Sequence, residues 1–185
     1  VHDQKDGRRY VGLAPRVGRL SGEVLAGLAD AVEVAGGARV RPTPLQKLVV
    51  LDVAPDRVTD LLARVEPLGL TARPGPFRRA TMACTGIEYC KFAFVETKAA
   101  ATALAAELDS RFEGVGIDPP IGLAVNGCPN SCVRIQLADI GLKGQLSRTD
   151  GGEGFAYQVH LGGGLATMGR PEAGFGRTVR GLRVT

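Results

Sequence analysis

The four cysteines of this chain occur as two close pairs, and their spacing constrains the fold more than any other feature. Cys84 and Cys90 have five residues between them, Cys128 and Cys132 have three, and 37 residues separate the two pairs. No thiol is left over, so two distant loops must meet if all four cysteines act together. Four cysteines arranged in this way typically hold a metal.

Three arrangements could use two cysteine pairs. Disulfides are typical of small chains in oxidising compartments, whereas this chain has 185 residues, 44% of them hydrophobic, and can bury a core without crosslinks. Structural zinc sites usually have about two to four residues between paired cysteines, and the five-residue gap containing Ile87, Glu88 and Tyr89 fits that spacing poorly. Cysteines of iron–sulfur clusters are more unevenly spaced and are often followed by proline, as Pro129 follows Cys128. The spacing therefore favours a cluster, with zinc and disulfides as alternatives.

The second cysteine pair is predicted to lie at the start of a helix. Pro129 suits the first helical position, where its missing N–H is not needed, and Cys128 and Cys132 would then share one helix face. Free N–H groups of that first turn would offset the negative charge of thiolates and sulfides. Gly86 and Gly127 would either let the backbone approach an inorganic core or simply form turns.

Composition gives no indication of a nucleic-acid or membrane partner. The net charge is +4 and the pI about 9.1, but no long Lys/Arg run is interleaved with aromatic residues, and tryptophan is absent. Such mild basicity suits a face for an acidic protein partner. The polar start of the sequence does not resemble a signal peptide, and no apolar run approaches about 18 residues. We therefore expect a cytoplasmic protein with reduced thiols.

Residues 1–75 show the order strand, helix, strand, strand, helix, which is that of a ferredoxin-like half-domain. Ser21 is a predicted N-cap, and Gly36-Gly37 a predicted end, of the first helix. Pro74-Gly75-Pro76 marks the predicted boundary between domains 1–75 and 76–185. The predicted elements are a strand at Tyr10–Ala14, a helix after Ser21, an extended segment at Val40–Pro44, a strand at Lys47–Val53 and a helix from Pro55 to Gly69.

Residues 76–185 are predicted to form an α/β domain, so that the whole chain is of the α+β class. A long alanine-rich helix is expected over Glu88–Phe112, with Leu104 and Leu108 on its buried face. Because the chain lacks an initial methionine and ends in a predicted strand, we expect a segment of a longer protein. The remaining expected elements are strands at Ile121–Val125, Ile140–Leu146, Phe155–Leu161 and Leu182–Thr185, a short helix continuing through Val133–Leu137 and a turn at Asp150–Gly154.

The residues around the cysteines resemble the motif of sirohaem-dependent nitrite and sulfite reductases. The resemblance is most specific in Met82-Ala83-Cys84, in Cys90 and in the run Val125-Asn126-Gly127-Cys128-Pro129-Asn130-Ser131-Cys132. Further matches cover nearly the whole chain, at Val11–Leu13, Gly18–Leu20, Arg41–Gln46, Ala138–Gly144 and His160–Gly163.

This resemblance implies a cofactor set. In that family four cysteines hold one 4Fe–4S cluster, which assigns Cys84, Cys90, Cys128 and Cys132 as metal ligands, and the last of them also binds the sirohaem iron. The implied function is six-electron reduction of sulfite to sulfide or of nitrite to ammonia, at a coupled sirohaem–4Fe–4S centre. Asn130 and Arg134 are then candidates to bind the cluster or the sirohaem, although both also suit an ordinary turn or surface. Arg78, Arg79 and Lys91 are candidates for the sirohaem carboxylates or the electron donor.

The resemblance also implies partners. The expected electron donor is ferredoxin and the expected substrate a small inorganic anion. Leu45 replaces an arginine that faces the substrate in the first of the family's two half-domain copies. This substitution suggests that the chain is the carboxy-terminal half of the enzyme, completed by an amino-terminal half that carries the substrate-binding basic residues. His2 and His160 are expected to be structural, and Lys143 to lie on the surface.

Alternative functions stay open on the sequence alone. One is a cobalamin-pathway precorrin monooxygenase that uses the same cluster motif. The other is a non-catalytic module that holds an iron–sulfur cluster or zinc. The sequence does not separate sulfite from nitrite, because the residues that face the substrate are expected outside this chain.

Overall fold

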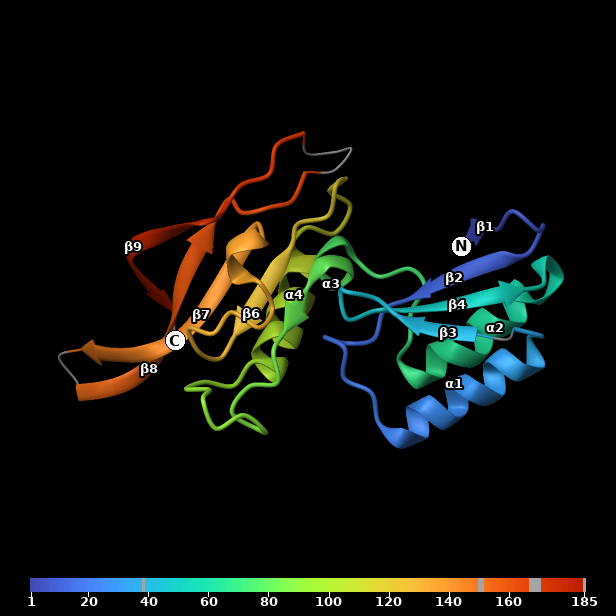
Figure 1. Cartoon of the computed structure of the whole chain (residues 1–185), viewed down its shortest axis with the longest axis horizontal. Coiled ribbons are helices and arrows are strands. Elements are labelled where there is room, and N and C mark those ends of the chain that lie inside the picture. The colour runs from blue at the N-terminus through green and yellow to red at the C-terminus, as the bar shows by residue number, and fades with distance from the viewer. Residues whose placement is uncertain (38, 150–151, 167–170, 185) are drawn as a thin grey trace. The chain divides into compact units, whose positions relative to one another are not determined.

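The chain forms two compact units, Val1–Pro74 and Gly75–Thr185. Figure 1 shows the computed structural model, which describes residues 1–37, 39–149, 152–166 and 171–184. The break between the units falls within the Pro74-Gly75-Pro76 segment.

The first unit is a four-stranded antiparallel sheet with two helices on one face (Figure 1). The sheet order is β1-β2-β4-β3, so that β4 lies between two strands joined through α1. This split crossover is the ferredoxin-like pattern, which confirms the predicted order strand, helix, strand, strand, helix. The elements are β1 His2–Asp3, β2 Arg9–Leu13, α1 Gly22–Val34, β3 Arg39–Pro42, β4 Leu48–Val53 and α2 Val58–Val65.

The first helix begins and ends where its sequence predicts. The Ser21 hydroxyl accepts a hydrogen bond from the amide of Val24 (3.2 Å), and Gly36 follows the helix with φ +66°. Leu25 lies on the outer face and is 49% exposed, because the apolar stripe of this helix is wider than the face that it buries. The core joins both helices to the sheet through Val11, Leu13, Leu28, Val32, Val50, Leu61 and Val65.

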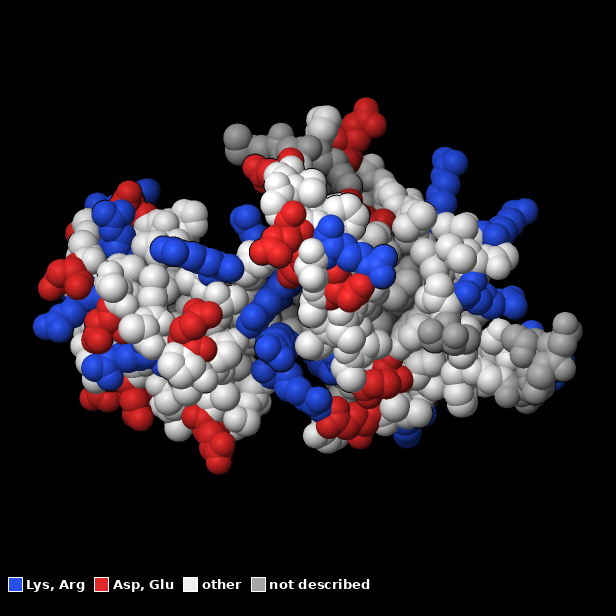
Figure 2. Space-filling view, turned by 180° about the vertical axis from the view of Figure 1, so that it is seen from behind, with Lys and Arg blue, Asp and Glu red and all other residues white. Residues whose placement is uncertain are grey.

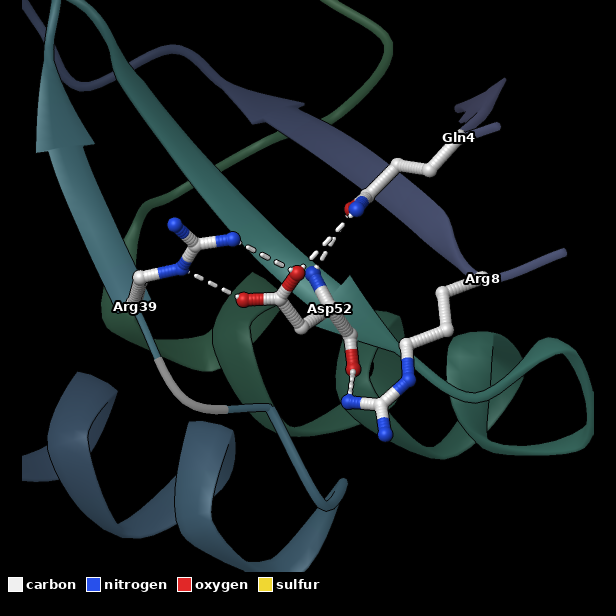
Figure 3. A network of polar contacts seen from close by, with 4 residues as sticks. All are labelled: Gln4, Arg8, Arg39 and Asp52. Carbon is white, nitrogen blue, oxygen red and sulfur yellow. Dashed lines mark hydrogen bonds and ion pairs between the residues drawn. The ribbon is translucent and has the colours of Figure 1, made fainter. Parts of the chain in front are cut away.

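A polar network around Asp52 joins β3, β4 and the residue that follows β1 (Figure 3). Asp52 has a left-handed backbone (φ +65°), and its carboxylate accepts two hydrogen bonds from Arg39, from Nε at 2.7 Å and from Nη2 at 2.9 Å. Gln4 donates to the same carboxylate (3.1 Å) and accepts from the Asp52 amide (2.7 Å). These contacts hold the pKa of Asp52 well below its ordinary value, chiefly through the hydrogen bonds from Arg39 and Gln4. The network therefore fixes an irregular strand end in one ionised form.

The second unit is a five-stranded mixed sheet with the order β5-β6-β7-β8-β9. β5, β6 and β7 are parallel neighbours, whereas β7–β8 and β8–β9 are antiparallel. The predicted turn at 150–154 falls partly outside the described residues, and Gly152 already belongs to β8. The elements are α3 Pro76–Ala80, β5 Met82–Ala83, α4 Lys98–Arg111, β6 Leu123–Asn126, a 3₁₀ turn at Ile135–Leu137, β7 Ile140–Thr149, β8 Gly152–Leu161 and β9 Arg177–Val184.

The long helix predicted from Glu88 is wrong in its first ten residues, since α4 begins only at Lys98. The preceding segment forms only isolated turns: the amide of Cys90 closes a single helical turn with the carbonyl of Gly86 (3.0 Å), and the amide of Phe94 bonds away from the segment, to the carbonyl of Gly127 (2.8 Å). The predicted buried face is confirmed in its direction, because Ala101 and Ala105, the residues that α4 buries, lie on the same face as Leu104 and Leu108. Leu104 and Leu108 are only half-buried.

Together the two units confirm the predicted α+β class. Within the described residues, no helix is long and apolar enough to cross a membrane.

Candidate metal centre

The sheet of the second unit brings the two cysteine pairs to one edge. β5 and β6 are parallel, with Ala83 in register with Val125, so that Cys84 and Gly127 both follow the ends of their strands at the same edge. The Cys84 amide donates to the carbonyl of Val125 (3.0 Å), and the Gly127 amide points at the sulfur of Cys84 (3.2 Å). A backbone N–H directed at a cysteine sulfur stabilises negative charge on it.

Backbone hydrogen bonds hold the Cys90 loop against the same edge. The amide of Ile87 donates to the carbonyl of Val95 (3.3 Å), which closes the loop on itself. The Phe94 amide then donates to the carbonyl of Gly127, directly before Cys128. The loop of the first pair and the loop of the second are therefore joined through the main chain.

The helix predicted to begin at Pro129 does not form, and Cys128 and Cys132 do not share a helix face. The chain turns instead, since Ser131 and Arg134 both have a left-handed backbone with φ +56°, and a helix cannot pass through such residues. Only the 3₁₀ turn Ile135–Leu137 follows. The expectation that the N–H groups of a helix end face the sulfurs is thus wrong, and the Gly127 amide is a donor that the structure provides to Cys84.

Side chains of Asn126 and Ser131 organise this turn from within. Asn126 is 0% exposed; its Nδ2 donates to the carbonyl of Cys128 (2.6 Å), and its Oδ1 accepts from the amide of Val133 (3.3 Å). The Ser131 hydroxyl donates to Gln136 and accepts from the amide of Ile135 (3.2 Å). The turn that carries Cys132 is therefore tied to the end of β6 and to the 3₁₀ turn.

The two glycines of the motif pack closely against other parts of the protein. A Cβ on Gly86 would lie 2.5 Å from Oγ1 of Thr97, and one on Gly127 would lie 2.8 Å from Cβ of Ala93. Gly86 also has φ +75°, so it serves a turn. These glycines allow the two cysteine loops to pack on the segment that precedes α4.

All four cysteines are free thiols, so the structure forms neither of the two disulfides considered from the sequence. Cys128 is 5% exposed, Cys84 and Cys90 are partly buried, and Cys132 is exposed. Among the described residues, no three His, Cys, Asp or Glu side chains lie in an arrangement that could hold a single metal ion. The donor set, the joined loops and the amide directed at Cys84 fit a cluster held by thiolates.

Arg78 and Arg79, predicted to face a cofactor or the electron donor, lie on the short helix α3 before β5. The carboxylate of Asp109 accepts from the amides of Phe77 (2.9 Å) and Arg78 (3.2 Å), which caps this helix from α4. Arg79 is exposed and Arg78 partly buried. Their roles stay predictions.

The other candidates flank the cysteines. Asn130 is exposed, and Arg134 places Nη2 3.5 Å from the sulfur of Met82, beside β5. Lys91 is exposed, with its ammonium 5.4 Å from the centre of the Phe92 ring. The structure therefore places Arg134 beside β5, which leads to Cys84, and the group that Arg134 binds stays a prediction.

The histidines and Lys143 have different surroundings. His2 stacks on Tyr10 in the first unit, with ring centres 4.8 Å apart. His160 is buried on β8, with Nδ1 3.4 Å from the hydroxyl of Thr178. Burial, followed by the charge of Lys143, lowers the pKa of His160. The sequence predicts Lys143 on the surface, whereas the structure places it partly buried in β7.

Sequence reasoning missed three residues that organise the cysteine edge: Asn126, Thr97 and Tyr157. The Tyr157 hydroxyl donates to the carbonyl of Glu96, which fixes the segment before α4. Burial, aided by the nearby charges of Glu96 and Cys84, raises the pKa of Tyr157 to about 12, so the phenol stays protonated. Asn126 carried a usable signal, since it is a polar residue that ends a continuous apolar strand.

The surface charge is mixed on the face drawn in Figure 2. Acidic and basic side chains both occur over each unit in that view. This face therefore does not carry the uniformly basic surface that would identify an acidic partner by itself.

The fold and the cysteine edge define a two-unit α+β protein in which a ferredoxin-like unit precedes a thiol-bearing mixed sheet. The chain belongs to the nitrite and sulfite reductase family: residues 2–68 match its ferredoxin-like half domain, and residues 75–182 match its 4Fe-4S domain.

Known relatives are similar over all or most of the chain. A protein named sulfite reductase (ferredoxin) 1 of Mycolicibacterium paratuberculosis is 49% identical over 188 residues, which is 100% of this chain and 33% of that protein. A ferredoxin–nitrite reductase of Synechococcus elongatus is 38% identical, over 88% of this chain and 31% of its own length. The solved structure of the NirA protein of Mycobacterium tuberculosis has a TM-score of 0.93 and 48% identity, covering 100% of this chain and 34% of that one. The chain thus spans about a third of the length of the curated relatives that it matches.

Proposed function

We propose that this chain is the cluster-bearing part of an enzyme that reduces sulfite to sulfide or nitrite to ammonia at a coupled sirohaem–4Fe–4S centre. The observation that supports the proposal is that the loops carrying the two cysteine pairs are hydrogen-bonded together at one edge of the second sheet. The names of the relatives, ferredoxin-dependent sulfite and nitrite reductases, support this activity. They do not favour the cobalamin-pathway monooxygenase that the motif alone had left open.

In this proposal Cys84, Cys90, Cys128 and Cys132 would hold the cluster, and Cys132 would also bind the sirohaem, so that the two groups would be coupled for electron transfer. The exposure of Cys132, in contrast to the buried Cys128, supports a contact with a second large group. The bound cofactors supply the electron transfer, which no protein side chain can provide. Asn130, Arg134, Arg78 and Arg79 are the proposed contacts to these cofactors, with arginine suited to their carboxylates.

The protein's own contribution is to position and shield the sulfurs. Asn126 holds the backbone on both sides of the second pair, so that the direction of Cys132 is set before any cofactor binds. The Gly127 amide offsets negative charge at Cys84. Burial of Cys128 keeps water away from one side of the cluster.

The partners follow from the same proposal. Ferredoxin is the proposed electron donor and a small inorganic anion the substrate. An amino-terminal part of the same enzyme would supply the basic residues that bind the anion, and this chain, which spans about a third of its relatives' length, would be a carboxy-terminal part. Free thiols suit a cytoplasmic location.

Anaerobic reconstitution of the protein with iron, sulfide and sirohaem tests the proposal. We expect about four iron and four sulfide per chain, a broad brown absorption and, with sirohaem, added Soret and red-region bands. In Cys132→Ser the sirohaem should no longer be coupled to the cluster, although some cluster remains. In Cys84→Ser both the cluster and its coupling to the sirohaem should be lost. A colourless protein with stoichiometric zinc, or wild-type reductase activity in Cys132→Ser, would contradict the assignment.

A further inference from the structure

Thr97 lies between the two cysteine loops. It is 0% exposed and directly precedes α4. Its hydroxyl donates to the carbonyl of Cys84 (2.7 Å), and the same oxygen lies 3.9 Å from the Cys84 sulfur. One buried hydroxyl thus contacts both the backbone and the thiol of a single cysteine.

Thr97 also sets the spacing of the loops. Both motif glycines pack against it, since a Cβ on Gly86 would meet its Oγ1 at 2.5 Å, and one on Gly127 would meet its Cγ2 at 3.3 Å. Gly127 is the residue whose amide points at the Cys84 sulfur. The methyl group of Thr97 therefore packs against Gly127, whose amide donates to the Cys84 sulfur. Its hydroxyl contacts Cys84, the residue that carries the accepting sulfur.

The contact between Thr97 and the sulfur must reverse when Cys84 becomes a metal ligand. In the free thiol the S–H group donates to the Thr97 oxygen. A thiolate has no hydrogen to donate and only accepts. Rotation about one C–O bond lets the Thr97 hydroxyl turn its hydrogen from the Cys84 carbonyl towards the sulfur.

We propose that Thr97 is a positioning residue for the cluster, whose hydroxyl hydrogen bond at Cys84 raises the reduction potential. This inference rests on the proposed function, because it presupposes that Cys84 is a cluster ligand. The reduced cluster carries more negative charge than the oxidised one, so a donor near a ligand sulfur stabilises the reduced form. Hydrogen bonds to the sulfurs are among the features that set such potentials.

The test compares Thr97→Val with Thr97→Ser in the reconstituted protein, by redox titration of the cluster followed by electron paramagnetic resonance. Valine keeps the shape and removes the hydroxyl, so the midpoint potential should shift to more negative values. Serine keeps the hydroxyl and should stay near the wild-type potential, although the lost methyl group lowers the melting temperature. Iron–sulfur stretching frequencies in resonance Raman spectra should change in the valine variant alone.

Thr81→Val is the matched control. Thr81 is 1% exposed, and its hydroxyl also donates to a backbone carbonyl, that of Phe77, at 2.7 Å. This variant should lose comparable thermal stability without moving the potential. If Thr97→Val and Thr81→Val both keep the wild-type potential, Thr97 is merely structural and the inference is overturned. If the wild-type protein itself takes up no iron and sulfide, it is the proposed function that fails.

Discussion

Replacing Asn126 by alanine should destabilise the second unit, because the Asn126 side chain spans the Cys128–Cys132 turn from the end of β6. The amide side chain is 0% exposed and spans the turn, donating to the Cys128 carbonyl (2.6 Å) and accepting from the Val133 amide (3.3 Å). Alanine leaves both backbone groups without this partner in buried surroundings. Each such loss costs about 1–3 kcal/mol, with the longer bond at the low end. We therefore expect Asn126→Ala to lose about 2–4 kcal/mol.

Urea unfolding of the apoprotein measures this loss, and hydrogen exchange of the β6 and β7 amides assigns it to the second unit. Against a typical domain stability of about 5–15 kcal/mol, the change is large enough to weaken cluster assembly as well. Asn130→Ala is the control, because Asn130 is exposed in the same turn and should change stability by about 0.5 kcal/mol or less. An Asn126→Ala protein with wild-type stability and wild-type β6 exchange would refute the bridging role.

Three further changes test other contacts. Wild-type protein should lose stability as the pH falls below about 4, because the folded pKa of Asp52 is depressed and its carboxylate must be protonated on unfolding; Asp52→Asn, which also loses the ion pair with Arg39, should show a shallower acid slope in urea midpoints. For Tyr157, whose folded pKa of about 12 exceeds the ordinary value of about 10, stability should fall as the pH rises between these values, and Tyr157→Phe should remove that part of the alkaline slope. Gly127→Ala should cost about 1–3 kcal/mol because its Cβ would lie 2.8 Å from that of Ala93, and an unchanged melting temperature would show that the loops yield freely.

Local patterns predicted the first unit well because its elements follow simple rules. Ser21, Gly36 and the apolar spacing of α1 gave the helix its bounds, and the β-rich run before Pro55 gave β4. The Asp52 network was not predictable in the same way, since Gln4, Arg39 and Asp52 come from three separate segments. No local pattern indicates that such residues meet.

The cysteine edge was predicted in its ligand types and not in its backbone. The alanine-rich composition extended the predicted α4 back to Glu88, but the Phe94 amide bonds to the carbonyl of Gly127 in the second cysteine loop, which competes with helix formation there. The proline at 129 indicated a helix start, but the left-handed Ser131 and Arg134 follow it. At the start of α4 a long-range contact overrides the local preference, and after Pro129 the side-chain bonds of Asn126 and Ser131 do so.

The two left-handed residues that bracket Cys132 have an energetic consequence. Each such conformation in a residue other than glycine costs on the order of 1 kcal/mol and persists only where the surroundings enforce it. Glycine at Ser131 or Arg134 would relieve this cost, but it would also free the main chain on that side of the sulfur. The left-handed residues therefore lower the stability of the turn, and they fix the backbone from which the Cys132 thiol projects.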